Sequence, residues 1–497
     1  MATPTKPRRR ATAVAGAARA ARGSALYLDD RLPFARWLRP QLRKLFPSHW
    51  SFLLGELALY SFVFLLLTGA FLTLFFKPNP DVAFASVREI SLEVRGGLLM
   101  RQLHHWSATV FVLSIVAHLC RVFFTGAFRK PRELTWLLGV VLFVMVLANS
   151  FIGVSMLGDQ LAFSGLREAQ GLLLSVPLIG TYLSAFGFGG AFPGDAVPRL
   201  FLTHVILIPG ILLAAVPLHA LILTWRQKHT ERKATATAED KVTGGPFFPY
   251  FAIKNGATAL FTMGAITLLA TLVRVNPVWE HGAYTPGAAP PSAQPFWYYG
   301  VLDGALRLTP AWEIPVGGYV LQVGLWIPMA VLTAFFLVLL AYPFLERRRT
   351  GDTGHHQLLD RPSDAPVRTG LGVAVLTFFT VLWAGTWVSA APPAVTAAPG
   401  PAAPPPAPAA LLTVPAGTYQ AVIVGLRVAV FVLPVVAFLL TRALCRRRGP
   451  AGGLRPGRLR ARRLRPPAAP AAGNGEGRPP CGERPCVRRA TCGGISR

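Results

Sequence analysis

Eight apolar runs constrain this chain of 497 residues more than any other feature of its sequence. A helix needs about 20 predominantly apolar residues to cross the hydrocarbon core of a bilayer. Because lipid offers the backbone no hydrogen-bond partners, such runs cross the membrane as helices. The sequence therefore predicts an all-α polytopic membrane protein with about eight transmembrane helices, the first four forming a bundle. The expected spans are residues 52–76, 104–125, 134–157, 200–224, 256–275, 321–345, 368–390 and 418–444.

Basic residues gather in short loops and in the two tails. The formal net charge of +28 at pH 7 would suit a nucleic-acid partner. However, the basic clusters fall in alternate loops, which is the pattern that orients membrane proteins with those loops in the cytoplasm. We therefore expect both termini in the cytoplasm and no nucleic-acid partner. The clusters lie at residues 121–132, 226–233, 347–349 and 442–448.

Composition divides the chain into five segments. They are a basic cytoplasmic tail (1–45), the four-helix bundle (46–232), a region with spans five and six (233–349), a region with spans seven and eight (350–445) and an Arg-rich cytoplasmic tail (446–497). No apolar segment follows the basic start closely enough for a cleaved signal peptide. Residues 165–184 are expected to form amphipathic helices at the membrane interface. The Pro- and Ala-rich stretch 391–419 is expected to be an external linker.

The cysteines indicate no disulfide framework. The chain has five, and Cys481, Cys486 and Cys492 lie in the Arg-rich tail without a recognised zinc or haem-attachment spacing. This tail has the composition of a disordered segment.

Two expected spans each carry a pair of histidines at matched depths. His104 and His118 are 14 residues apart, and His204 and His219 are 15 apart. On a helix, 14 residues advance about 21 Å and stop about 40° short of whole turns, whereas 15 advance about 22 Å and overshoot by about 60°. Each helix therefore carries two imidazoles on one stripe, one near each membrane face. The adjacent His105 points about 100° away and is not expected to be a ligand.

Ionisable residues inside membrane spans are costly and usually functional. A neutral imidazole that binds iron removes this cost, and histidine is a common axial ligand of haem. For a single histidine, a hydrogen bond between helices would explain the residue equally well. Two pairs at matched depths favour two stacked metal centres.

Glycine pairs on the first and third spans match the histidine period. Gly55 and Gly69 are 14 residues apart, as are Gly139 and Gly153. Glycine lets the backbone approach a bulky group closely, so these positions can seat porphyrin faces; the alternative is ordinary packing of helix against helix.

Two arginines flank the histidines of the second span. Arg101 and Arg121 each lie three residues from a histidine on that helix, where they can pair with haem propionates. Their alternative role is interfacial charge.

Four stretches identify a known family. They are Met100-Arg-Gln-Leu-His-His-Trp106, Arg121-Val-Phe-Phe-Thr-Gly-Ala-Phe-Arg-Lys-Pro-Arg-Glu133, Ile179-Gly-Thr181 and Asn276-Pro-Val-Trp279. On these stretches the chain resembles the cytochrome b subunit of an actinobacterial-type menaquinol:cytochrome c oxidoreductase (cytochrome bc1 complex). The resemblance is close over residues 45–345, whereas spans seven and eight match only in hydropathy. The 15-residue spacing is similar to the chloroplast-type branch, but without a cysteine near Gly55 its extra covalent haem is not expected.

The resemblance implies two non-covalent b-type haems. His104 and His204 would bind the iron of the low-potential haem near the external face, and His118 and His219 that of the high-potential haem near the cytoplasmic face. Menaquinol oxidised externally would pass one electron to an iron–sulfur partner and the other through the haems to a cytoplasmic-side quinone. Moving one charge across 100 mV costs about 2.3 kcal/mol, so the inward transfer conserves energy.

The resemblance also implies partners and a location. A Rieske-type iron–sulfur subunit and a cytochrome c subunit are expected, in a homodimeric complex that can join an oxidase supercomplex. The surrounding membrane lipid would be that of the bacterial plasma membrane.

The external quinol site of this family contains a Pro-(Glu/Asp)-Trp-Tyr motif. Here Pro295, Trp297 and Tyr298 keep its frame, but Phe296 stands in place of the carboxylate. A carboxylate there would accept the quinol proton as a general base, which phenylalanine cannot do. The alternative proton acceptors are Asp303, Glu280, a water molecule or a residue of a partner. Of these, Asp303 resembles another residue that the family carries.

The cytoplasmic quinone site is less readable from the sequence. By topology, the polar residues expected at that face are His49, Trp50, Thr224, Lys228 and His229. Polar residues at any membrane boundary would give the same pattern.

Three functions are compatible with these patterns. The first is an electron-transfer subunit that oxidises menaquinol. The second is a haem-binding but catalytically impaired paralogue, which Phe296 would explain. The third is a haem-free membrane transporter whose polar residues line a pathway.

Overall fold

The computed structural model describes residues 34–47, 49–223, 244–287, 297–390 and 412–447, together with Glu239 and scattered positions before residue 32. Most of residues 391–419, the Arg-rich tail with its three cysteines, and Thr224, Lys228 and His229 lie outside this part of the chain. The described fold belongs to one compact unit, Met1–Gly449.

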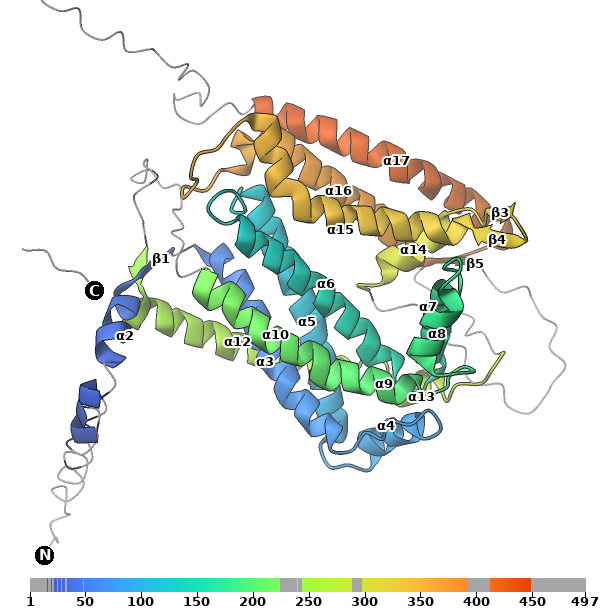
Figure 1. Ribbon diagram of the computed structural model, residues 1–497, viewed down its shortest axis with the longest axis horizontal. Helices are drawn as coiled ribbons and strands as arrows, with labels where there is room; N and C mark the ends of the chain where they lie inside the picture. The colour runs from blue at the N-terminus through green and yellow to red at the C-terminus, as the bar shows by residue number, and fades with distance from the viewer. Residues whose placement is uncertain are drawn as a thin grey trace, which may run out of the picture. The chain divides into compact units, whose positions relative to one another are not determined.

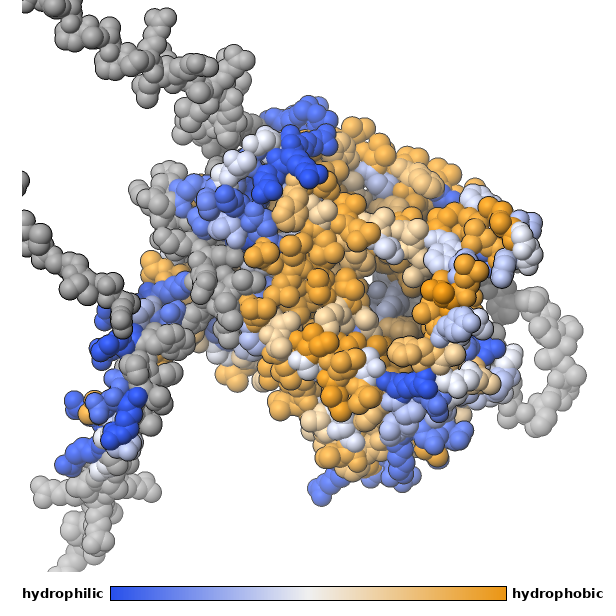
Figure 2. All heavy atoms as spheres, viewed as in Figure 1, coloured by the Kyte–Doolittle hydropathy of each residue, from blue (hydrophilic) through white to orange (hydrophobic). Residues whose placement is uncertain are grey.

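Eight helices in the described ranges are long and apolar enough to cross a membrane, which confirms the all-α polytopic prediction. They are Trp50–Thr73, Gly97–Phe124, Glu133–Ser155, Ala196–Ala220, Phe247–Leu272, Val323–Thr350, Pro366–Thr386 and Gly417–Arg447. Figure 1 shows them as long, roughly side-by-side ribbons. Large apolar side chains remain exposed on several of them, including Phe431 at 76%. Figure 2 shows this apolar surface between hydrophilic ends, as expected for helices that face lipid.

The second span begins earlier than the apolar run indicated. Helix α5 spans Gly97–Phe124 rather than starting at residue 104. Gly96, with a left-handed φ of 76°, sets the turn that lets the helix start there. The preceding loop also contains a short helix, α4 (Ala83–Leu92). Arg101 therefore lies within the helix rather than in a loop.

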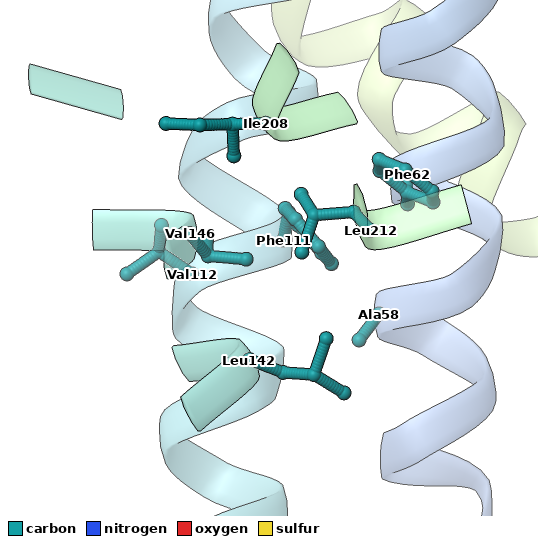
Figure 3. Close-up of a cluster of buried hydrophobic side chains, with 8 residues drawn as sticks. All are labelled: Ala58, Phe62, Phe111, Val112, Leu142, Val146, Ile208 and Leu212. Carbon is teal, nitrogen blue, oxygen red and sulfur yellow. The ribbon is translucent and has the colours of Figure 1, made fainter. Parts of the chain in front are cut away.

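The first four spans form one bundle. They consist of η1 (Trp50–Leu53) with α3 (Leu54–Thr73), α5, α6 (Glu133–Ser155), and a fourth span made of α9 (Ala196–Leu202), η2 (Thr203–Leu207), α10 (Ile208–Pro217) and η3 (Leu218–Leu223). Their central core comprises Ala58, Phe62, Phe111, Val112, Leu142, Val146, Ile208 and Leu212 (Figure 3). Because lipid is as apolar as these side chains, van der Waals contact rather than exclusion of water holds this layer together.

Two short helices cover one end of the bundle. They are α7 (Gln160–Leu174) and α8 (Gly180–Phe188), in the region where helices were expected over 165–184. Of the two, α8 is apolar on its exposed side, at Tyr182 and Phe186, rather than amphipathic. The side chain of Asp159 caps α7 by accepting a 2.7 Å hydrogen bond from the backbone N–H of Ala162. Phe163 is buried beneath α7 while Arg167 is exposed, so the helix is two-sided.

The rest of the chain packs beside the bundle. It comprises α2 (Phe34–Arg43), β1 (Leu45–Phe46), β2 (Gly245–Pro246), η4 (Phe247–Phe251), α12 (Ala252–Leu272), α13 (Val278–His281), α14 (Gly300–Leu308), β3 (Glu313–Val316), β4 (Tyr319–Gln322), α15 (Val323–Thr350), η5 (Pro362–Asp364), α16 (Pro366–Thr386), β5 (Val388–Ala390), β6 (Leu412–Val414) and α17 (Ala416–Arg447). The strands form three two-stranded pairs: β1–β2 and β3–β4 are antiparallel, and β5–β6 is parallel. Helices α14, α16 and α17 share a hydrophobic core of their own.

A buried ion-pair network joins the loop after α5 to the ends of α15 and α16. The guanidinium of Arg368, only 5% exposed, lies 3.0 Å from Glu346 Oε1 and 2.7 Å from Asp360 Oδ2. Arg129 also reaches Asp360 Oδ2, at 2.7 Å. Although burial works in the opposite direction, these two arginines hold the pKa of Asp360 below its usual value. Arg129, which belongs to one of the basic clusters expected to orient the chain, therefore also ties loops together.

We expect Arg368→Ala to lower the free energy of unfolding by about 1–3 kcal/mol, because the half-buried Glu346 loses its cation while Asp360 keeps Arg129. Thermal unfolding of the purified protein in detergent measures this loss. Arg361→Ala removes an exposed arginine nearby and should have little effect. Equal unfolding temperatures for the two variants would contradict a structural role for the network.

Candidate functional site

The four histidines of the expected spans meet in two layers. The rings of His104 and His204 face each other with centroids 6.3 Å apart and an interplanar angle of 70°. Imidazole nitrogens bind metals such as zinc at about 2.0–2.1 Å, so a centroid separation of this size leaves room for one metal atom between the two rings. His118 and His219 line a single cavity of about 700 Å³. The pairing by depth is therefore the arrangement that the fold adopts.

The Nδ1 atoms of His104 and His204 are held by neighbouring helices. His104 Nδ1 lies 3.0 Å from Thr68 Oγ1, and His204 Nδ1 lies 3.0 Å from the carbonyl oxygen of Asn149. Metal-binding histidines usually engage their second nitrogen in this way, which orients the ring and leaves Nε2 for the metal.

Each expected glycine lies against one of these imidazoles. A Cβ atom added at Gly55 would come 3.2 Å from His118 Cε1, and one at Gly69 would come 3.2 Å from His104 Cε1. The corresponding distances are 3.1 Å between Gly139 and His219 Cε1, and 2.5 Å between Gly153 and His204 Cε1. The glycines therefore leave the space that the imidazoles occupy, whereas the sequence predicted that they seat porphyrin faces.

The fourth span explains how a spacing of 15 residues keeps both histidines on one face. His204 lies in the π-helical turn η2, and His219 lies in the π-helical turn η3. A π turn takes up more residues than an α turn, so it absorbs the overshoot expected from regular helix geometry. Such turns often occur at functional sites.

Arginines also line the cavity that contains His118 and His219, which is called the inner cavity below. Arg121 lines it, and its guanidinium carbon lies 3.7 Å from the centroid of the Phe52 ring. Arg132 lines it too, is 1% exposed, and donates 2.6 Å hydrogen bonds to the carbonyl oxygens of Ala127 and His356. Burial lowers the pKa of Arg132 to about 10, so the guanidinium stays charged at neutral pH. Sequence reasoning grouped Arg132 with a basic loop and missed its position in the cavity.

Arg101 is engaged at the opposite end of α5. Its guanidinium donates hydrogen bonds to Ser91 Oγ at 3.2 Å and to the carbonyl oxygen of Asn276 at 2.5 Å. Arg101 therefore anchors α5 to α4 and to the loop after α12. His105, the neighbour of His104, is half-buried and meets none of the four glycines.

The expected quinol frame is partly described. Pro295 and Phe296 lie outside the described residues, whereas Trp297 and Tyr298 pack against the central core of the bundle. The Trp383 indole N–H donates to the Trp297 carbonyl oxygen at 3.0 Å, which fixes this segment to α16. Asp303 Oδ2 lies 2.7 Å from Arg307 Nε. The candidate replacement for the missing carboxylate is thus already ion-paired.

The inner cavity includes polar residues that the sequence reading did not select. Glu56 and Tyr60 line it from α3, and Asn255 lines it from α12. His49 and Trp50, which were considered for this face, are exposed and are not among its lining residues. The sequence signal for Glu56 was present, because an acidic residue within a span is a functional candidate.

The chain is similar to known proteins over most of its length. A family profile described as "Cytochrome b(N-terminal)/b6/petB" matches residues 109–283. The "Cytochrome bc1 complex cytochrome b subunit" of Streptomyces coelicolor is 38% identical over 84% of this chain and 76% of its own. The proteins of the same name from Mycobacterium leprae and Corynebacterium efficiens are 44% and 43% identical, each over 71% of this chain and over 68% and 69% of their own. A solved structure titled "Hyperthermophilic respiratory Complex III" shares the fold, with a TM-score of 0.60 and 20% identity over 84% of this chain and 99% of that chain.

Proposed function

We propose that this chain, which belongs to the cytochrome b subunits of cytochrome bc1 complexes, oxidises menaquinol near the external face and carries electrons across the membrane to a cytoplasmic-side quinone. These subunits are membrane proteins of respiratory electron transfer. The observation that carries the proposal is the pair of facing imidazoles, with centroids 6.3 Å apart, repeated in depth by a second pair.

The residues present fit two non-covalent b-type haems. His104 with His204 would hold the low-potential haem iron, and His118 with His219 the high-potential one. When bound, the two haems supply reversible one-electron transfer between the membrane faces. Arg121 would neutralise propionates of the inner haem, and the buried charge of Arg132 adds to that role. Arg101 would pair with a propionate of the outer haem. Its hydrogen bonds to Ser91 and Asn276 use two of its five N–H groups, so three remain for that role.

The glycines would complete the two haem sites. Gly69 and Gly153 lie beside the outer imidazoles, and Gly55 and Gly139 lie beside the inner ones. A side chain at any of these positions would push an imidazole out of its place. The four positions thus keep the ring orientation that a shared metal atom requires.

The partners and location follow from the family. We propose a Rieske-type iron–sulfur subunit and a cytochrome c subunit as partners, within a homodimeric complex that can join an oxidase supercomplex in the bacterial plasma membrane. Placement of both termini in the cytoplasm is supported by the arginines at the ends of α15 and α17, which Figure 2 shows as hydrophilic surface.

We expect His104→Leu to abolish the low-potential b-type component and to spare the other one, because only the outer pair loses a ligand. Redox titration of reduced-minus-oxidised spectra of membranes measures both components. His105→Leu is the matched control and should retain both. Loss of neither component in His104→Leu would overturn the pairing, and the absence of b-type components in the parent protein would favour a haem-free transporter.

We expect Gly139→Val to remove the high-potential component selectively. Its Cβ would stand 3.1 Å from His219 Cε1, and the two methyl groups would displace the imidazole. Gly264→Val, in the span formed by α12, is the control because an added Cβ meets nothing within 4 Å there. The same spectroscopic titration measures both variants. Unchanged spectra for Gly139→Val would contradict the role of Gly139 at the high-potential haem site.

A second candidate is a haem-binding paralogue with impaired quinol oxidation. Phe296 supplies no carboxylate, and Asp303 is engaged by Arg307. This candidate differs from the first only in the proton-accepting step at the external site.

We expect Phe296→Asp to raise quinol oxidation by the assembled complex about tenfold or more, because a positioned general base commonly contributes factors of 10²–10⁴. Steady-state turnover with menaquinol measures the gain. Phe296→Asn is similar in size to Asp and should give no gain. If the parent protein is already fast and Asp adds nothing, the impaired-paralogue reading is wrong.

A further inference from the structure

The inner cavity has two chemically different sides. It extends from the central core, at Phe62 and Phe111, to Phe46 and Phe247 at the end where α3 begins. Arg121 and Arg132 line it from the side of α5 and α6. Glu56, Tyr60 and Asn255 line it from α3 and α12. One side can neutralise anions, whereas the other presents an acid and an amide.

Glu56 and Asn255 form a pair with spare hydrogen-bonding capacity. Their side chains hydrogen-bond each other. Among the described residues, Glu56 Oε2 and Asn255 Oδ1 are both buried and have no hydrogen-bond partner. Buried polar atoms in native proteins nearly always have partners, so each such exception needs an explanation. Two adjacent exceptions at one cavity wall indicate a ligand that completes them.

The charge of Glu56 restricts the kind of ligand. In its carboxylate form Glu56 would repel haem propionates, which Arg121 and Arg132 on the opposite side would attract. The ligand beside Glu56 is therefore neutral and able to hydrogen-bond an acid. Aromatic rings flank this end of the cavity: Phe46 and Phe251 stack with centroids 4.6 Å apart and an interplanar angle of 19°. A flat, neutral ring with carbonyl oxygens, which is a quinone, matches these walls.

We propose that Glu56 is the acid that protonates the quinone at the inner end of the chain, and that Asn255 is its positioning residue. The inference rests on the proposed function, which brings electrons to this end. Reduction of a quinone to a quinol adds two electrons and two protons. Protonated Glu56 gives the proton on its carboxyl group to one quinone oxygen, so that a Glu O–H bond breaks and a quinol O–H bond forms. The carboxylate then takes a proton from cytoplasmic water. Cytoplasmic water also gives the second proton to the other quinone oxygen.

Several charged or titratable groups surround this acid. Lys254 on α12 interacts electrostatically with Glu56, and Tyr60 lies one turn further along α3. Lys44, His118 and the two arginines line the same cavity. The cations stabilise the carboxylate that Glu56 becomes when it gives its proton to the quinone. The pH profile of the reaction would then report on Glu56 within this set of charges.

The test is reoxidation of the haems by menadione, the soluble naphthoquinone headgroup of menaquinone. The complete complex is first reduced with a stoichiometric amount of reductant. It is then mixed with menadione at a series of pH values, and the absorbance of its b-type haems is measured over time. In the parent protein the rate should fall as pH rises, because the acid must be protonated. Glu56→Gln should slow the reaction at least tenfold and flatten its pH profile. Glu56→Asp should restore much of the rate, and Glu93→Gln, an exposed carboxylate at the end of α4, should behave as the parent does.

The outcomes separate the inference from the proposed function. Absence of two b-type components from the parent protein would overturn both. Two normal components in Glu56→Gln, with an unchanged rate and pH profile, would overturn the role of Glu56 alone. If Glu56→Gln fails to assemble, infrared difference spectra of the parent protein during reduction of menadione decide the question. A carboxylic-acid signal that shifts in Glu56→Asp supports the proposal, and the absence of any such signal overturns it.

Discussion

Contact between imidazole and glycine across neighbouring helices is the interaction on which the bundle depends. An imidazole inside a membrane needs both space and a hydrogen-bond partner. Helix α3 supplies the space for the histidines of α5, and helix α6 supplies it for those of the fourth span. Each helix therefore has to keep its register against its neighbour over two layers. A shift of one residue would rotate a glycine away from its histidine by about 100°.

The core between the two layers follows from the same register. Phe62, Phe111 and Val146 each lie midway between the two glycines or histidines of their own helix. Leu212 occupies the equivalent place on the fourth span, and all four meet in one cluster. Phe62 and Phe111 stack with centroids 5.5 Å apart. One periodicity thus specifies three layers of the bundle: two that bear histidine and an apolar one that separates them.

The loops carry more structure than their charge pattern indicated. Basic residues in alternate loops orient a chain in the membrane, and that rule needs only their approximate positions. In the fold, Arg368 and Arg129 converge on Asp360, while Arg132 turns inward to the cavity. Arginines that the charge pattern treats alike thus serve loop anchoring in one place and charge at the cavity in another. Only the paths of the loops distinguish these uses.

The sequence by itself determined the eight spans, the two depths at which histidines occur and the glycines that face them, because helix periodicity in lipid is a local property. It also indicated the family and the missing carboxylate at Phe296, since both are read from consecutive residues. It could not show that π turns accommodate the 15-residue spacing between His204 and His219, because such turns depend on packing. Nor could it bring Glu56 beside Asn255, about 200 residues further along the chain, since no local rule relates them. Only the tertiary structure decided how distant residues share one cavity, because that depends on how helices and loops pack in three dimensions.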